Sequence, residues 1–477
     1  MNIHPTVKEA ASIFINAGKQ VYLVGGAVRD ILRRGRANDW DLATDAKPEE
    51  VIELFSRPKG GRTAGNKNKI RSFVIPTGIK HGTVTLHYRD LKMEVTTFRS
   101  ESGYSNFRHP DRVSFGVSME EDLSRRDFTM NAAAYKLPKG PLVDPFDGRG
   151  DIKNSLIRCV GNPLERFSED ALRPMRAMRF ASQLNFNVDQ NLLDAIPAVL
   201  PLTKMVAVER IRDEMDKILV TDKPSIALGL MEKTGLLELL IPELAACRGV
   251  KQDRVNNSGY HKFDVLDHSL LGSDYASIDR TYYEGGNPLH VRLAVLYHDI
   301  GKATTAEPDG HGGWTFHGHD RESSKIARKI LRRFKYPNAL IEKVCILIDE
   351  HMFNYQENWS DAAVRRFIIR SGEENLRDLY SLRRADAFGT TGIEPSSSFL
   401  LPMMNRMEKI LSEKKALSLK DLAVSGKDLI KIGISPGKYM GIILEELLNT
   451  VIEDPELNTM EKLLEIAEKI NNRYKNN

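Results

Sequence analysis

The sequence predicts an α+β fold, in which a small N-terminal mixed β-sheet is followed by an all-helical body. Up to about residue 150, short apolar segments with strand character alternate with glycine turns and stretches of helical spacing. From about residue 160, apolar residues recur every three to four positions, which is the period of an amphipathic helix. We expect four parts: a head over 1–150, a helical neck over 151–250, a histidine-rich helical domain over 251–395 and a helical tail over 396–477.

The composition is that of an ordinary globular protein, and it excludes several classes. The 477 residues are 41% hydrophobic and 28% charged, and a net charge of +4 neither requires nor excludes a nucleic-acid partner. Cys159, Cys247 and Cys345 are far apart and form no CxxC motif, which argues against a disulfide framework and for the cytoplasm. We expect no signal peptide and no membrane span, because no window approaches about 18 consecutive apolar residues. The sequence does not indicate the oligomeric state.

Four segments of the head are predicted strands, and the last two form a hairpin around Arg89-Asp90-Leu91. They are QVYLVGG (20–26), DWDLAT (39–44), GTVTLHY (82–88) and LKMEVTTF (91–98).

Three carboxylates on these strands are candidate metal ligands. Asp39 and Asp41 are two residues apart, so on a strand they point to one face while Trp40 packs on the other. Two convergent carboxylates suit one or two Mg²⁺ ions, which bind phosphates as well as protein oxygens. Glu94 alternates with apolar neighbours and supplies the third carboxylate that a two-metal nucleotidyl transfer needs. The alternative is that these are surface acids on exposed strands.

A glycine turn precedes the carboxylates and predicts a phosphate site. Gly25 and Gly26 let the backbone approach a triphosphate closely, because no Cβ intervenes. The helix that begins there offers free N–H groups to anions, and Arg29 reaches the same phosphates.

The segment SEDALRPMRAMRFASQL (168–184) predicts one helix that reads the base. Asp170, Arg173, Arg176 and Arg179 follow one another at steps of three, on one face. Asp170 accepts from the amino group of cytosine or adenine, and Arg173 donates to the adjacent ring atom. Uracil and guanine place a carbonyl oxygen opposite Asp170, and the unpaired group costs about 1–3 kcal/mol. Arg176 and Arg179 face phosphates or stabilise the site. The alternative is a salt-bridged amphipathic helix.

Three further features bear on nucleotide or RNA binding. We expect Pro174 to kink the base-reading helix. In RRDFT (125–129), Arg126 is predicted to contact the nucleotide and Asp127 to hold an arginine, with a structural ion pair as the alternative. The segment 57–71 carries six Lys or Arg and no acid, and is either a solvated loop or a phosphate-contacting loop.

Histidines cluster in the helical region from about 260 to 390. An adjacent His-Asp pair on an apolar helix, with histidines on neighbouring helices, suits Mn, Ni, Fe or Mg in mixed coordination. Asp386 is a candidate closing ligand, and a purely structural role is the alternative. The candidate ligands are His268, His298, Asp299, His317, His319 and His351.

Together these motifs resemble the class II nucleotidyltransferases of the polymerase β superfamily, namely the bacterial CCA-adding enzymes and their poly(A) polymerase relatives. The resemblance rests on LVGGAVRD, DWDLATDA, TGIKHGTVTL, EVTTFR, RRDFTMNAAAY and SEDALRPMRAMRFASQL, in family order. It implies Mg²⁺-dependent transfer of CMP and AMP from CTP and ATP to the 3′ end of tRNA, whose acceptor arm is bound. It assigns base templating to Glu169, Asp170 and Arg173. Residues 100–115 resemble a flexible loop that argues against addition of C alone.

The histidine-rich half resembles the HD phosphohydrolase domain that follows the polymerase in many bacterial CCA-adding enzymes. This resemblance implies phosphodiesterase or phosphatase activity with a transition metal such as Ni²⁺ or Mn²⁺. Alternatives are an enzyme that adds only A, a poly(A) polymerase, and an HD phosphohydrolase with an RNA-binding N-terminal half.

Overall fold

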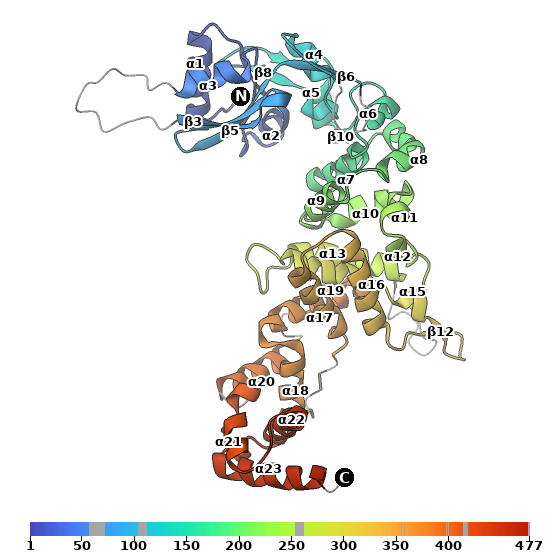
Figure 1. The fold of residues 1–477 in the computed structure, drawn as a ribbon. Helices are drawn as coiled ribbons and strands as arrows, with labels where there is room; N and C mark the ends of the chain where they lie inside the picture. Colours follow the sequence, from blue (N-terminus) through green and yellow to red (C-terminus); the bar gives the residue numbers. More distant parts are fainter. Residues whose placement is uncertain are drawn as a thin grey trace, which may run out of the picture. The chain divides into compact units, whose positions relative to one another are not determined.

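The computed structural model describes residues 1–56, 72–103, 112–252, 262–353, 355–356, 358–396, 398, 400–413 and 418–475. The chain forms two compact units, Met1–Ala245 and Ala246–Asn477 (Figure 1). The basic segment 57–71 lies outside the described residues, as does 104–111 of the segment that resembles a flexible loop. No helix in the part of the chain that the structure describes is long and apolar enough to cross a membrane.

The head is built on a mixed seven-stranded sheet in the order β3-β4-β5-β2-β1-β8-β9. β2 and β5 pair in parallel and the other neighbours are antiparallel, so the predicted mixed sheet is confirmed. The strands are β1 (Val21–Val24), β2 (Asp41–Thr44), β3 (Ser72–Gly78), β4 (Thr83–Tyr88), β5 (Leu91–Thr97), β8 (Ala134–Lys136) and β9 (Leu142–Val143). A separate hairpin joins β6 (Arg99–Ser102) to β7 (Arg112–Phe115).

The four predicted strands are all present, with shorter ends. Gly25 and Gly26 begin helix α2 (Gly25–Arg34) instead of ending β1. Asp39 precedes β2, which begins at Asp41, so Asp39 and Asp41 are not two positions of one strand. Trp40 is buried in the core as expected.

The two faces of the sheet are covered differently. Helices α1 (Pro5–Asn16) and α3 (Pro48–Ser56) pack on one face, where β4 and β5 contribute alternate side chains such as Leu86 and Met93 to the main core (Figure 1). On the other face, a smaller core over β1, β2 and β8 includes Met119 and Leu123 of α4 (Met119–Ser124). That face therefore presents the remaining side chains of β4 and β5 beside Asp41.

A run of helices completes the N-terminal unit. They are α5 (Gly148–Lys153), α6 (Pro163–Glu169), α7 (Arg173–Leu184), α8 (Gln190–Thr203), α9 (Val208–Leu219), α10 (Pro224–Lys233), α11 (Leu236–Leu240) and α12 (Pro242–Ala245).

The single helix predicted over 168–184 is wrong. α6 ends at Glu169, Asp170 has an extended backbone (φ −137°, ψ 104°), and α7 begins at Arg173. A proline ring clashes with the carbonyl four residues earlier in a continuous helix, and for Pro174 that carbonyl belongs to Asp170. Interruption of the helix removes the clash. Pro174 then lies in the first turn of α7, where its missing N–H has no partner to lose, so the expected kink is also absent.

Among the described residues of the C-terminal unit, the only strands are β12 (Glu307–Pro308) and β13 (Trp314–Thr315), which form a short ribbon, and the other regular elements are helices. α13 packs on α14 and α19, and α17 packs on α14 and α16. The helices are α13 (Val265–Ile278), α14 (Leu289–Tyr297), α15 (Lys302–Thr305), α16 (His319–Arg333), α17 (Asn338–Asp349), α18 (Asp361–Ser371), α19 (Leu376–Thr391), α20 (Leu401–Ser412), α21 (Gly426–Lys431), α22 (Lys438–Glu453) and α23 (Met460–Lys475).

Candidate functional site

A cavity of about 740 Å³ in the N-terminal unit gathers the residues that the sequence predicts for transfer and nucleotide binding, except Glu169, which does not line it. Its lining comes from the start of α2, from β2 and β5, from the segment after α4, and from α7. The predicted residues that line it are Gly25, Gly26, Arg29, Asp39, Asp41, Glu94, Arg126, Asp170, Arg173, Arg176 and Arg179.

Two parallel strands hold Asp41 and Glu94 opposite each other. Asp41 is the first residue of β2 and pairs with Glu94 on β5, while Asp39 enters the cavity from the segment before β2. Burial and then the charge of Glu94 raise the pKa of Asp41 to about 6, and Arg126 acts in the opposite direction. A divalent cation between these oxygens offsets their repulsion, so the donor set fits Mg²⁺.

The wall of the cavity that the sequence predicts to bind phosphates is formed at the start of α2. Gly25 has φ +63°, and a Cβ there would lie 3.2 Å from Arg126 Nη1 and 3.5 Å from Asp41 Oδ2. Only glycine both adopts this backbone and leaves this space free. Arg29 is buried, and its Nη1 donates to Asn131 Oδ1 at 2.9 Å, so its guanidinium is fixed at the cavity wall.

Asp127 holds an arginine, as expected. It accepts from Nε and Nη2 of Arg176 at 2.9 and 2.6 Å. Burial alone would raise the pKa of Asp127, but the paired guanidinium outweighs it and holds that pKa at about 2. The pair ties the segment after α4 to α7 across the cavity.

We expect Asp127→Asn to lower the free energy of unfolding of the N-terminal unit by about 2 kcal/mol at pH 7. The folded pKa of Asp127 is depressed, so its stabilisation is complete above pH about 4 and is lost as the pH falls through about 2. The difference between wild type and variant should therefore fall to about half near pH 3. Trp40 fluorescence during urea unfolding reports this unit when Trp314 and Trp359 are replaced by Phe. A difference that does not change between pH 7 and pH 3 would contradict the ion-pair account.

The pair predicted to read the base is differently arranged. Arg173 lies in α7 and donates to Glu169 Oε2 at 2.6 Å and to the carbonyl of Arg166 at 2.8 Å. Asp170 lies outside α7, and its Oδ2 accepts from Arg210 Nη2 at 2.9 Å. Both side chains still line the cavity, but they do not share one helical face.

Arg176 and Arg179 follow Arg173 on α7, so the three arginines of the predicted row share this helix. Arg176 pairs with Asp127, and Arg179 Nε donates to Glu214 Oε2 at 2.6 Å. The Arg179 guanidinium also packs 4.0 Å from the centroid of the Phe180 ring. These contacts favour the stabilising role over direct phosphate contact.

Sequence reasoning missed several residues that line or support the cavity. Phe180 contacts three of the cavity's guanidinium groups, those of Arg29, Arg176 and Arg179. Asn131 accepts a hydrogen bond from Arg29, and Arg210 donates one to Asp170, each from a segment distant in the sequence. Glu214, the partner of Arg179, is buried in α9. The sequence offered a signal for it, because a charged residue on an otherwise apolar helix face is expected to have a partner.

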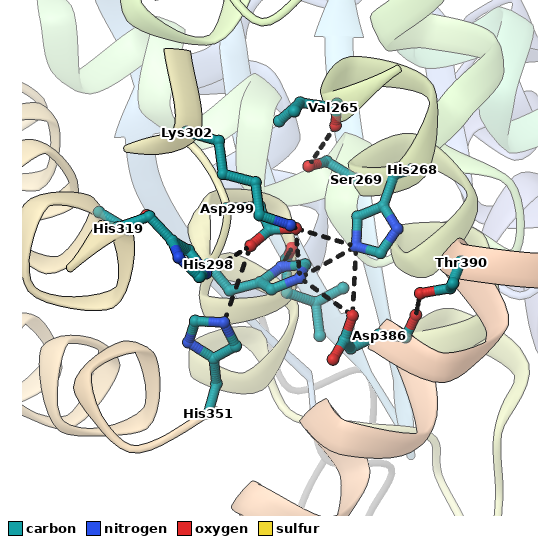
Figure 2. A network of polar contacts seen from close by, with 12 residues as sticks. Val265, His268, Ser269, His298, Asp299, Lys302, His319, His351, Asp386 and Thr390 are labelled. Carbon is teal, nitrogen blue, oxygen red and sulfur yellow. Dashed lines mark hydrogen bonds and ion pairs between the residues drawn. The ribbon is translucent and has the colours of Figure 1, made fainter. Parts of the chain in front are cut away.

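A second cluster lies in the C-terminal unit, where helices α13, α16 and α19 and the segments that directly follow α14 and α17 bring six side chains together (Figure 2). They form two groups that share one carboxylate. One group is His268, His298, Asp299 and Asp386, and the other is Asp299, His319 and His351. His268 Nε2 lies 3.3 Å from Asp299 Oδ2 and 3.3 Å from Asp386 Oδ1, and His319 Nε2 lies 3.2 Å from Asp299 Oδ1. Asp386 joins the cluster as its candidate closing ligand. His317, which lies two residues before His319, is exposed and lies outside the cluster.

The tautomers of three histidines in this cluster are set by the backbone. Nδ1 of His298, His319 and His351 lies 2.7–2.8 Å from a carbonyl oxygen of the preceding turn. A carbonyl only accepts, so each Nδ1 carries the hydrogen, and in the neutral ring Nε2 keeps a lone pair.

Those Nε2 lone pairs and the carboxylates face one another in a buried space. Asp299 Oδ1, His319 Nε2 and His351 Nε2 have no hydrogen-bond partner among the described residues. Burial alone would raise the pKa of Asp299, but His298 and Lys302 hold it well below the usual range. Unpaired buried acceptors are costly, and a cation bound to imidazole nitrogen and carboxylate oxygen removes that cost. The donor set of the cluster therefore fits a transition metal such as Ni²⁺ or Mn²⁺, and Asp299 belongs to both groups of residues that would hold it.

Comparison with known proteins identifies the family of the whole chain. Three sequence families match, described as "Poly A polymerase head domain" over 21–158, "Probable RNA and SrmB- binding site of polymerase A" over 185–248 and "tRNA nucleotidyltransferase domain 2 putative" over 313–467. The CCA-adding enzyme of Lactobacillus helveticus is 44% identical over 457 residues, covering 94% of each chain. The chain belongs to the CCA-adding enzyme family.

Other members agree along nearly the full length. The CCA-adding enzyme of Enterococcus faecalis is 34% identical over 473 residues, which cover 97% of this chain and 96% of that protein. The crystal structure of the Bacillus stearothermophilus CCA-adding enzyme in complex with CTP is similar with a TM-score of 0.70, 28% identity and full coverage of both chains. The CCA-adding enzyme fold thus extends over both units of this chain.

Proposed function

We propose that this protein adds C, C and A to the 3′ end of tRNA from CTP and ATP, without a nucleic-acid template, in the cytoplasm. The observation that carries the proposal is the single cavity that joins Asp39, Asp41 and Glu94 to the glycine turn of α2 and to Asp170 and Arg173. Its parts supply what nucleotidyl transfer requires, namely metal ligands, a phosphate site and groups that contact a base. A pure RNA-binding module has no need of three convergent carboxylates.

Each wall of the cavity has its own task in this proposal. Asp39, Asp41 and Glu94 hold Mg²⁺, which when bound activates the attacking hydroxyl and neutralises the leaving pyrophosphate. Gly25 and Arg126 lie against the triphosphate, because the Gly25 backbone and the guanidinium border the same space as Asp41. Arg29 is fixed by Asn131 and supports the same wall.

The base is read where α6 gives way to α7. Asp170 accepts from the amino group shared by cytosine and adenine, and Arg173 donates beside it. Because Asp170 is held by Arg210 and Arg173 by Glu169, both groups are fixed before the nucleotide enters. Fixed donors and acceptors reject UTP and GTP more strongly than mobile ones, since they cannot turn to a second arrangement.

We expect Asp170→Ala to reduce discrimination against UTP and GTP by about tenfold or more. In wild type these nucleotides leave the Asp170 carboxylate without a donor, which costs about 1–3 kcal/mol, and the variant has no such carboxylate. The measurement is kcat/KM for all four nucleotides in competition on one tRNA. Arg212→Ala is the control, because Arg212 belongs to the same helix as Arg210 but pairs with the exposed Asp213. Unchanged nucleotide preference would remove Asp170 from base selection.

The addition itself is tested with tRNA that ends before its CCA. CTP alone should extend it by two nucleotides, both nucleotides together should extend it by three, and ATP alone should not extend it. A tRNA that already ends in CC should accept one A. Extension only of the CC-ending substrate would indicate an A-adding enzyme, and a long A ladder would indicate a poly(A) polymerase.

The C-terminal cluster supports a second activity, the hydrolysis of phosphoesters. The observation in its favour is that Asp299 Oδ1, His319 Nε2 and His351 Nε2 are buried, belong to one group of possible metal ligands and have no hydrogen-bond partner among the described residues. A transition metal held there supplies a hydroxide nucleophile near neutral pH. Lys302, whose Nζ lies 2.6 Å from Asp299 Oδ2, places a positive charge beside the carboxylate (Figure 2).

A further inference from the structure

Exposed aromatic and aliphatic side chains continue the catalytic face of the head sheet beyond Glu94. On β3, the edge strand, Phe73 is 47% exposed and Ile75 is 39% exposed. Val74 between them packs toward the main core, so Phe73 and Ile75 point to the opposite face. Large apolar side chains on an open edge strand are a liability for a soluble protein, so their presence beside a functional site needs a cause.

Strand register connects these side chains to the carboxylates. Asp41 pairs with Glu94, Glu94 with Thr85, and Thr85 with Ile75, which makes one row across four strands. In the next row, Lys92 pairs with His87 and His87 with Phe73. Neighbouring strands are about 4.8 Å apart, so Ile75 is about 10 Å from Glu94 along the sheet, roughly the reach of one or two nucleotides.

Phe73 and His87 form a flat surface on this face. Their rings are stacked, with centroids 4.4 Å apart and an interplanar angle of 7°. Phe73 is the more exposed of the two, and Lys92 is exposed in the same row. Aromatic faces with a cation nearby are the usual way in which proteins bind single-stranded nucleic acid.

The geometry of the reaction places the 3′ end of the tRNA on the side of the carboxylates where β4 and β5 lie. In an in-line displacement, the attacking oxygen and the leaving oxygen lie on opposite sides of the phosphorus. Gly25 and Arg126 lie on the α2 side of Asp41, where the pyrophosphate leaves. The attacking 3′ hydroxyl therefore approaches from the opposite side, over β5 and β4.

We propose that Phe73, His87 and Ile75 form a stacking platform for the unpaired nucleotides that precede the attacking 3′ hydroxyl of the tRNA. The inference rests on the proposed function and adds the site of the acceptor strand. Stacking suits this task because every base has a π face. Three successive additions place different nucleotides at the same position, and a site built on hydrogen bonds to base edges would reject some of them.

Phe73→Ala tests the platform through the tRNA and not through the nucleotide. Loss of one stacked base should raise the KM for tRNA about tenfold, while the KM for CTP stays within about twofold. Phe73→Trp keeps a stacking ring and should restore the KM for tRNA, whereas Phe73→Leu should not. Ile15→Ala is the matched control, because Ile15 is 40% exposed on α1, whose buried side chains belong to the core on the other face of the sheet.

A binding measurement separates failure of the platform from failure of the proposed function. A tRNA with 2-aminopurine next to its 3′ end should change fluorescence on binding to wild type, and this change should be lost in Phe73→Ala and kept in Phe73→Trp. The same change in all three proteins, or an unaltered KM for tRNA in Phe73→Ala, overturns the platform. If wild type shows the Phe73-dependent change but adds no nucleotide, the platform stands and the proposed function fails.

Discussion

Asp41→Asn should reduce the rate of CMP and AMP incorporation by at least about 1,000-fold, because it removes the candidate metal-binding carboxylate that pairs across the strands with Glu94. Asparagine keeps the shape of the side chain but loses the negative charge that a divalent cation requires. Asp39→Asn should have an effect of the same order. The measurement is single-turnover incorporation into tRNA at saturating Mg²⁺.

The folded state should tolerate this change. The pKa of Asp41 is raised in the folded protein, so the ionised carboxylate opposes folding above its unfolded pKa, and the opposition is complete above pH about 6. Without divalent metal, Asp41→Asn should therefore unfold at the same or a higher urea concentration than wild type at pH 7.5. Asp90→Asn, at the exposed turn between β4 and β5, is the control and should keep full activity. Near-normal turnover in Asp41→Asn would refute the assignment of the metal ligands.

The second large effect is expected in the C-terminal unit. A variant that combines His298→Ala with Asp299→Ala should bind Ni²⁺ or Mn²⁺ at least about 100-fold more weakly, because Asp299 belongs to both groups of ligands. Hydrolysis of 2′,3′-cyclic nucleotides or small phosphoesters should be lost with the metal. CCA addition should persist, since the two sets of ligands belong to different compact units.

Metal content must be assigned to this cluster and not to the head. The measurement is elemental analysis of two proteins that both carry Asp39→Asn and Asp41→Asn. One has the intact C-terminal cluster, and the other also carries His298→Ala and Asp299→Ala. Asp299→Asn, which preserves side-chain volume, controls for collapse of the buried space. If the protein with an intact cluster retains no transition metal and hydrolyses none of these esters, the cluster has a structural role only.

The strands and the face of the sheet on which Glu94 lies could be predicted, because each depends on local pattern. Alternation of Met93, Glu94 and Val95 determines which side chains point away from the core, and the glycines at 25 and 26 mark the turn that borders the cavity. The parallel pairing of β2 with β5, which places Asp41 opposite Glu94, follows from the topology of the whole sheet and has no local signal.

The errors have identifiable physical causes. The three-residue spacing of Asp170 and Arg173 suggested one helix, but the ring of Pro174 excludes a helical carbonyl at Asp170, and this clash was readable from the sequence. Partners such as Arg210 were not readable, because their contact with Asp170 depends on how α9 packs. His317 and His319 are equally plausible by composition, and only the start of α16 at His319 decides which of them faces Asp299.

The most direct test of the central claim, that the head carboxylates hold the metal that transfers the nucleotide, is sulfur substitution at the α-phosphate. Mg²⁺ binds sulfur poorly and Mn²⁺ binds it better, so a metal contact to a substituted oxygen is visible as a change of metal preference. One diastereomer of CTP with an α-phosphorothioate should be incorporated at least about tenfold more slowly than CTP in Mg²⁺ and recover in Mn²⁺. The His298→Ala/Asp299→Ala variant should behave in the same way. Slow incorporation that Mn²⁺ does not restore, or restoration that requires His298 and Asp299, would contradict the account.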